Sequence, residues 1–121
     1  MKNKIRKFNK SKRYNVTGLG PYQFTEYKPG EFYDWHTDSS DVAYKERFAS
    51  IVILLNDDYV DGFLEIKHDN EIIKFEKSIG SLFVFYSSML HRVSPVSEGT
   101  RYSLVNWVSL EKIDGFKQTL I

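Results

Sequence analysis

Two side chains that bind metal ions stand two residues apart in this chain, at His36 and Asp38. Because two residues is the side-chain period of a β-strand, an imidazole and a carboxylate at this spacing leave the same face and can bind one ion. A single His-x-Asp is a weak signal when it is counted alone. The pair becomes informative only if the rest of the sequence supplies the other parts of a metal site.

A third candidate ligand, His91, lies 53 residues after Asp38. It can reach the earlier pair only if a sheet folds back on itself, as it does in a jelly roll. Two histidines and one carboxylate on one face of a metal suit non-haem Fe(II), which needs open positions for a cosubstrate and for O₂. The alternative is a hydrogen-bonded histidine near the start of a strand.

A candidate anion-binding group follows ten residues later, at Arg101. This residue begins the next predicted strand, and Ser103 lies on the same face two residues on. A guanidinium fork beside a hydroxyl suits a carboxylate, because arginine can bind both of its oxygens at once. The alternative is an arginine at a sheet edge in a surface ion pair.

The elements that must position these groups are short strands with turns between them. About eight such strands and almost no helical periodicity indicate an antiparallel sandwich or barrel. The loops are expected at residues 39–46, 87–89 and 94–100, and the tail from Glu111 fits either a short helix or a strand. The strands are expected at residues 22–28, 32–38, 47–55, 63–67, 71–75, 81–86, 91–93 and 101–109.

Composition sets the broad class. The chain has 121 residues, 41% of them hydrophobic, which suffices for one compact domain with a core. There is no cysteine, so disulfides, thiolate zinc sites and a cysteine nucleophile are excluded. No apolar run approaches the length of a membrane span, and the sequence favours a soluble cytoplasmic protein.

Charge is distributed unevenly. Residues 1–13 hold seven lysines and arginines and no acid, although the net charge of the whole chain is only +1. Residues 1–21 are therefore interpreted as a basic N-terminal arm and a leading loop, with the functional domain at residues 22–121. Such an arm could touch nucleic acid or an acidic partner, but a solvated terminus is the simpler interpretation.

Taken together, these residues resemble a known family. The motifs occur along the chain in the order Tyr-x-Pro-Gly-x-x-Tyr-x-x-His-x-Asp, Asp-Gly-x-Leu, Gly-x-Leu-x-x-Phe, His-x-Val-x-Pro-Val and Arg-Tyr-Ser-x-x-x-Trp. This order resembles the Fe(II)- and 2-oxoglutarate-dependent dioxygenases. Within them it is most similar to the prolyl 4-hydroxylase-like branch, which includes bacterial and phage-like PKHD-type hydroxylases. The resemblance runs from about Tyr22 to Ser109.

The resemblance implies an all-β, double-stranded β-helix (jelly-roll, cupin-like) core with few or no helices. It implies Fe(II), 2-oxoglutarate and O₂ as cofactor and cosubstrates, with ascorbate in support. The residues that it assigns are His36, Asp38 and His91 as iron ligands, Arg101 as the anchor for the distal carboxylate of 2-oxoglutarate, and Tyr27, Tyr33, Ser103 and Trp107 as the lining of the cosubstrate pocket.

The implied reaction is hydroxylation of an unactivated C–H bond with release of succinate and CO₂. A prolyl residue of a peptide or protein is the expected substrate; a free amino acid or small metabolite is the alternative within the same chemistry. The rivals are a non-catalytic cupin-like binding module and a zinc hydrolase. Relatives that act on nucleic acid carry a second arginine where this chain has Trp107, so a nucleic-acid substrate is not favoured.

Two departures from the family pattern are visible. Some relatives place a cosubstrate-binding tyrosine on the strand where this chain has Leu54, so Tyr27, Ser50 or Ser103 must compensate. The N-terminal region is also short. Either the chain is a minimal, phage-like enzyme, or a partner or second protomer in a homodimer supplies the missing surface.

Overall fold

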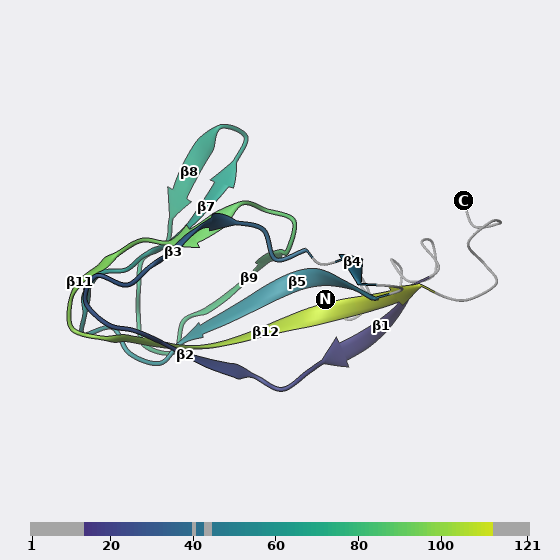
Figure 1. Ribbon diagram of the computed structural model, residues 1–121, viewed down its shortest axis with the longest axis horizontal. Coiled ribbons are helices and arrows are strands. Elements are labelled where there is room, and N and C mark those ends of the chain that lie inside the picture. The colour runs from purple at the N-terminus through teal and green to yellow at the C-terminus, as the bar shows by residue number, and fades with distance from the viewer. Residues whose placement is uncertain (1–13, 40, 43–44, 113–121) are drawn as a thin grey trace.

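The computed structural model describes residues 14–39, 41–42 and 45–112. These residues form strands joined by turns and contain no helix (Figure 1), so none of them belongs to a helix long and apolar enough to cross a membrane. The basic arm predicted at residues 1–13 and the tail beyond residue 112 lie outside the described residues. The boundary between arm and domain therefore stays a prediction.

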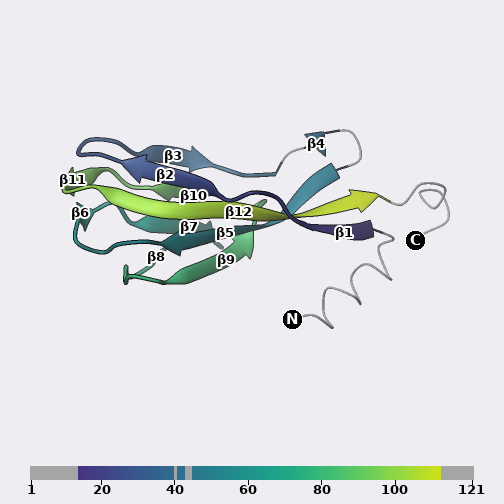
Figure 2. The ribbon, with the colours of Figure 1, turned by 90° about the horizontal axis from the view of Figure 1, so that it is seen from below.

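Six antiparallel strands form the larger sheet. β12 and β5 lie side by side at its centre and run along the length of the molecule (Figure 2). β2 pairs with the first half of β12 and β1 with its second half, while β9 and β4 pair with the other edge of β5. The six strands are β1 (Tyr14–Leu19), β2 (Gln23–Tyr27), β4 (Asp41–Val42), β5 (Lys45–Leu54), β9 (Leu82–Tyr86) and β12 (Arg101–Lys112).

A second sheet of four antiparallel strands faces the first, and a short two-stranded pair lies at one end of the molecule. The four strands are, in spatial order, β3 (Tyr33–His36), β10 (His91–Val93), β7 (Leu64–His68) and β8 (Glu71–Lys74). The short pair consists of β6 (Val60–Asp61) and β11 (Val96–Glu98).

The hairpin of β7 and β8 projects away from the larger sheet (Figure 1), and its two strands correspond to those predicted at residues 63–67 and 71–75. His68 pairs with Glu71, which leaves only Asp69 and Asn70 in the loop. Both have positive φ, 49° and 67°. A two-residue hairpin loop with this backbone is a type I′ turn, for which Asp and Asn are among the few suitable side chains.

The hydrophobic core lies between the two sheets. Val52 and Phe85 come from the larger sheet, and Leu64 and Ile66 come from the smaller one. The inward positions of β5 alternate as expected for a half-buried strand, since Ser50 as well as Val52 is buried. A serine at a fully buried position shows that the core changes from apolar to polar along β5.

The structure corrects the prediction that all of residues 1–21 are arm and loop, because Tyr14–Leu19 form β1. Its partner is the far end of β12, more than 80 residues later, with a register shift between Val16 and Gly18. No hairpin turn or clean alternation marks a strand whose pairing is this distant and irregular. Two short strands, β4 and β11, also lie in segments predicted to be loops. β11 pairs with the distant β6, whereas β4 pairs with the adjacent start of β5.

Two strand boundaries also differ from the predictions. The strand expected at residues 32–38 ends at His36, because the N–H of Asp38 bonds to the carbonyl of Ser87 instead of continuing the ladder with β10. The last strand extends to Lys112, so the segment from Glu111 begins as a strand.

Candidate active site

Three potential metal ligands converge at one end of the smaller sheet. His36 ends β3 and His91 begins β10, and the two residues are direct partners in the antiparallel ladder. Asp38 lies just past the end of β3 and turns toward them. One ligand atom from each of the three residues lies within 4.8 Å of the others. The three residues that the sequence predicts as ligands therefore lie together, although Asp38 reaches the two histidines from a loop and not from the strand itself.

Backbone carbonyls fix the orientation of both imidazoles. The Nδ1 of His36 lies 2.6 Å from the carbonyl of Asp34, and the Nδ1 of His91 lies 2.8 Å from that of Met89. Because a carbonyl oxygen only accepts hydrogen bonds, each Nδ1 carries the donated proton and each neutral ring keeps a lone pair on Nε2. Tyr33 stacks on His36 with ring centroids 3.7 Å apart, which further restricts that ring.

This arrangement fits a cation. The Nε2 atoms of His36 and His91 each lie 3.3 Å from a different oxygen of Asp38. Lone pairs and a carboxylate at this separation repel one another unless a proton or a metal ion lies between them. Two histidines and a carboxylate on one side of an ion, each with a hydrogen bond behind it, are the donor set of non-haem Fe(II) sites.

Asp38 is held by the larger sheet. Its Oδ2 accepts hydrogen bonds from Ser50 Oγ at 2.7 Å and from Trp107 Nε1 at 3.0 Å, two residues that are partners in the β5–β12 ladder. Since Ser50 donates its proton to Asp38, the fully buried Ser87 donates to Ser50. Burial by itself would raise the pKa of Asp38, but its interaction with His91 and the hydrogen bonds from Ser50 and Trp107 hold that pKa well below the ordinary value.

Trp107 is predicted to line the cosubstrate pocket, and in the structure its indole N–H donates a hydrogen bond to Asp38, a candidate metal ligand. We expect Trp107→Phe, which keeps a ring but removes the N–H, to weaken Mn²⁺ binding about 10- to 100-fold, the usual effect of removing a hydrogen bond behind a ligand. Isothermal titration calorimetry measures this change. Trp35→Phe is the matched control, because Trp35 lies against Lys67 and Arg92; equal effects of the two substitutions would contradict the assignment.

Arg101 is a buried cation. It is 2% exposed, and its Nε and Nη1 donate to the carbonyl of Gly62 and the hydroxyl of Ser103, both at 3.2 Å. No carboxylate of the described residues forms an ion pair with it. Burial lowers the pKa of Arg101, in part offset by Tyr59 and Tyr27. Because a buried charge without a counter-ion is costly, the geometry calls for an anionic ligand.

Ser103 and Asn56 hold Arg101 in place. Ser103 is fully buried and is also hydrogen-bonded to Thr25 on β2. The side chain of Asn56 accepts from the N–H of Tyr102 at 2.8 Å and donates to the carbonyl of Thr100 at 2.7 Å. The start of β12 is therefore anchored on both sides of Arg101.

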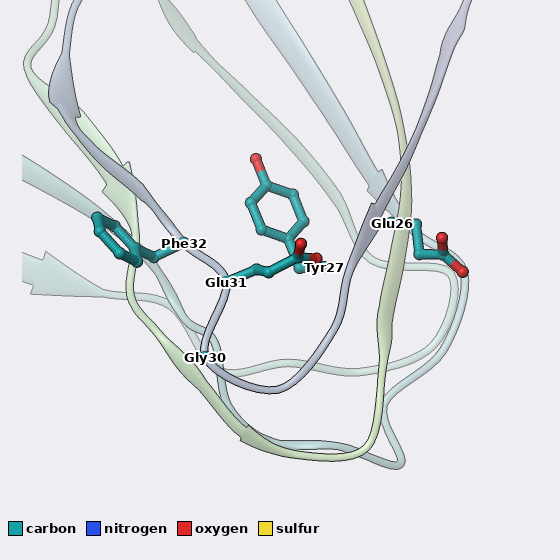
Figure 3. Close-up of a pocket in the computed structure, with 5 residues that line it drawn as sticks. All are labelled: Glu26, Tyr27, Gly30, Glu31 and Phe32. Atoms are coloured by element: carbon teal, nitrogen blue, oxygen red, sulfur yellow. The ribbon is translucent and has the colours of Figure 1, made fainter.

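Tyr27 is close to Arg101 and is also affected by the charge of Asp38, one of the candidate metal ligands. It pairs with Arg101 in the β2–β12 ladder, and the guanidinium carbon lies 5.4 Å from its ring centroid. Burial raises the pKa of Tyr27, Arg101 lowers it, and the charge of Asp38 acts in the raising direction, so the hydroxyl senses both groups. An open hollow of about 450 Å³ lies beside this residue, and Figure 3 shows Tyr27 and Glu26 on opposite sides of β2.

Sequence reasoning did not single out every residue at this site. It missed Ser87, whose hydroxyl supports Ser50, and the carbonyl of Gly62, which any residue type could supply. It also missed Tyr59, which is buried close to Arg101. One feature of the sequence could have pointed to Tyr59. It is an aromatic residue within a run of turn-forming residues, where a polar side chain would be enough to form the turn.

Comparisons with known proteins agree with this geometry. The profile of the 2OG-Fe(II) oxygenase superfamily matches residues 22–109. A PKHD-type hydroxylase of Synechococcus elongatus is 33% identical over 104 residues, which cover 81% of this chain and 47% of that protein. The chain thus spans about half the length of the curated relatives that it matches.

Solved structures confirm the predicted fold class. The crystal structure of a Pseudomonas putida prolyl-4-hydroxylase has a TM-score of 0.70 and 26% identity, over 93% of this chain and 63% of that one. A cupin domain from Bordetella pertussis shares the fold alone, with a TM-score of 0.52 and 12% identity over 78% of this chain and 90% of that one. On the profile match and the identity to the hydroxylase, the chain belongs to the 2OG-Fe(II) oxygenase superfamily, whose cofactors are Fe(II) and 2-oxoglutarate.

Proposed function

We propose that this chain hydroxylates a C–H bond of a prolyl residue in a peptide or protein, using Fe(II), O₂ and 2-oxoglutarate. One observation carries the proposal. A three-ligand metal site and a buried arginine without a counter-ion are positioned by the same strand, β12, which supplies Arg101 and the Trp107 that bonds to Asp38. A 2-oxo acid with a distal carboxylate has one group for each of these two sites.

The chain's own residues have distinct tasks in this proposal. His36, Asp38 and His91 hold the metal through Nε2, a carboxylate oxygen and Nε2. Arg101 binds the distal carboxylate of 2-oxoglutarate and so orients its 2-oxo acid end toward the metal. When bound, Fe(II) supplies the oxidising chemistry that converts O₂, 2-oxoglutarate and a C–H bond into succinate, CO₂ and an alcohol.

The substrate class is supported by relatives. The similar protein of Synechococcus elongatus is a PKHD-type hydroxylase, and the similar Pseudomonas putida structure is a prolyl-4-hydroxylase. Tyr33 is 53% exposed beside His36, and the adjacent Phe32 is 55% exposed. An exposed aromatic pair next to a metal ligand offers a surface on which the ring of a substrate proline can pack. A free amino acid is the second candidate within this chemistry.

The experiment is a substrate screen by succinate release. Fe(II) is added to the chain under nitrogen, and 2-oxoglutarate, ascorbate and air are then supplied with or without proline-containing peptides. We expect succinate formation that requires both Fe(II) and O₂, stimulation by a subset of peptides, and a mass gain of one oxygen in those peptides. Stimulation by free amino acids alone would replace the peptide with the second candidate.

Two results would contradict the proposed chemistry. Metal binding without any binding of 2-oxoglutarate would indicate a cupin-like binding module. Conversion of a substrate by the Zn²⁺-loaded chain under nitrogen would indicate a hydrolase.

A further inference from the structure

One buried polar atom of the described residues lacks a partner: the hydroxyl of Tyr59. Tyr59 lies in the turn between β5 and β6 and is only 5% exposed. A buried hydroxyl that makes no hydrogen bond destabilises a fold, and tyrosine hydroxyls in protein interiors usually find an acceptor or donor. Such an atom calls for a partner, and a bound ligand can supply one.

The unpaired hydroxyl lies beside the unpaired cation. Burial raises the pKa of Tyr59 and the charge of Arg101 lowers it; Tyr59 in turn affects the pKa of Arg101. The guanidinium has five N–H groups, and two of its hydrogen bonds go to Gly62 and Ser103. The Tyr59 hydroxyl interacts with this guanidinium, which can only donate, so donor capacity is left on Arg101 next to a hydroxyl whose own proton has no acceptor.

The chain holds the Tyr59 ring firmly in this position. Lys77 Nζ donates to the carbonyls of Tyr59 at 2.8 Å and Asp61 at 2.6 Å, and lies 4.1 Å from the ring centroid. A Cβ on Gly62 would lie 3.3 Å from the ring, and a Cβ on Gly99 would lie 3.1 Å from the Tyr59 backbone. Both glycines also have positive φ, so the close approach depends on glycine at both positions.

We propose that the Tyr59 hydroxyl is a second hydrogen-bond donor, beside Arg101, for the distal carboxylate of 2-oxoglutarate. The inference rests on the proposed function, since it concerns the cosubstrate of that same site. A carboxylate presents two oxygens with several lone pairs, so it can accept from a guanidinium and a hydroxyl together. One ligand group would thereby neutralise the buried charge and satisfy the unpaired hydroxyl.

The test compares two 2-oxo acids. 2-Oxoglutarate and 2-oxopentanoate share the 2-oxo acid end, but only the first has a distal carboxylate. Binding of each is measured by calorimetry on Mn²⁺-loaded protein without O₂, so that no turnover occurs. We expect Tyr59→Phe to weaken 2-oxoglutarate binding about tenfold, the effect of losing one hydrogen bond to a charged group, and to leave 2-oxopentanoate binding unchanged.

The matched control is Tyr86→Phe, because Tyr86 is 59% exposed on β9; it is expected to bind both acids like the unaltered chain. Thermal unfolding without ligand gives a second readout. Tyr59→Phe removes a buried hydroxyl whose proton has no acceptor, together with its interaction with Arg101, so the unfolding temperature of the ligand-free variant is not expected to fall substantially.

Two outcomes separate the inference from the function on which it rests. If the unaltered chain prefers 2-oxoglutarate and Tyr59→Phe binds it equally well, Tyr59 is not a ligand and the inference is overturned. If the unaltered chain does not distinguish the two acids, the proposed role of Arg101 fails, and the proposed function fails with it.

Discussion

Asp38→Asn is expected to abolish tight metal binding while the protein stays folded. The substitution keeps the shape of the side chain but removes the negative charge, and the amide cannot accept at both ends as the carboxylate does. Loss of a hydrogen bond behind a ligand already costs about 10- to 100-fold in metal affinity, so loss of the charged ligand itself is expected to cost more than about 100-fold.

Calorimetry with Mn²⁺ measures the affinity, and succinate release measures turnover. The sequence offers a matched control at the hairpin tip, where His68 and Asp69 also form a histidine–aspartate pair, with 3.3 Å between Nε2 and Oδ2. Both side chains there are exposed, and no third ligand lies near them among the residues that the structure describes. His68→Ala is expected to change neither quantity. Unchanged Mn²⁺ affinity in Asp38→Asn would remove the basis of the candidate metal site.

Arg101→Met is expected to separate cosubstrate binding from metal binding. Removing one member of a buried ion pair costs about 3–5 kcal/mol, which corresponds to a loss of about 100-fold or more in 2-oxoglutarate affinity. Metal affinity is expected to persist, because no metal ligand contacts Arg101 in the described residues. The ligand-free variant is not expected to be less stable, since a buried charge without a counter-ion has been replaced by an apolar side chain of similar length.

The control is Arg92→Met. Arg92 is paired with Glu65 at 3.0 Å on the smaller sheet, away from β12, and its loss should leave 2-oxoglutarate binding intact. Arg101→Lys is expected to be intermediate, because an ammonium keeps the charge but not the two-pronged geometry. If Arg101→Met bound 2-oxoglutarate as tightly as the unaltered chain, the anion would have to lie elsewhere.

β12 links the two halves of the candidate site. Its inward-facing residues include Arg101 and Ser103 at the anion-binding half and Trp107 at the metal-binding half. Positions two residues apart share a face of a strand, so a single element sets the spacing between both halves. The long pairing of β12 with β5 makes this spacing rigid and brings Ser50 opposite Trp107, where both bond to Asp38.

The local sequence determined which metal-binding and anion-binding side chains are present, and it indicated the fold class. The type and order of His36, Asp38, His91 and Arg101 predict a metal site and an anion site, because each site needs specific side chains that few positions supply. The strand alternation and the Asp69-Asn70 turn were also readable, since both depend on residues within a few positions of one another.

Only the tertiary structure decided how those groups act. The pairing of His91 with His36, the support of Asp38 by Trp107 and the pairing of β1 with β12 join segments far apart in sequence, so no local pattern marks them. The unpaired hydroxyl of Tyr59 is also a property of three-dimensional packing, because burial without a partner depends on every neighbouring segment. The sequence therefore determined which groups are present, and long-range pairing determined which of them meet.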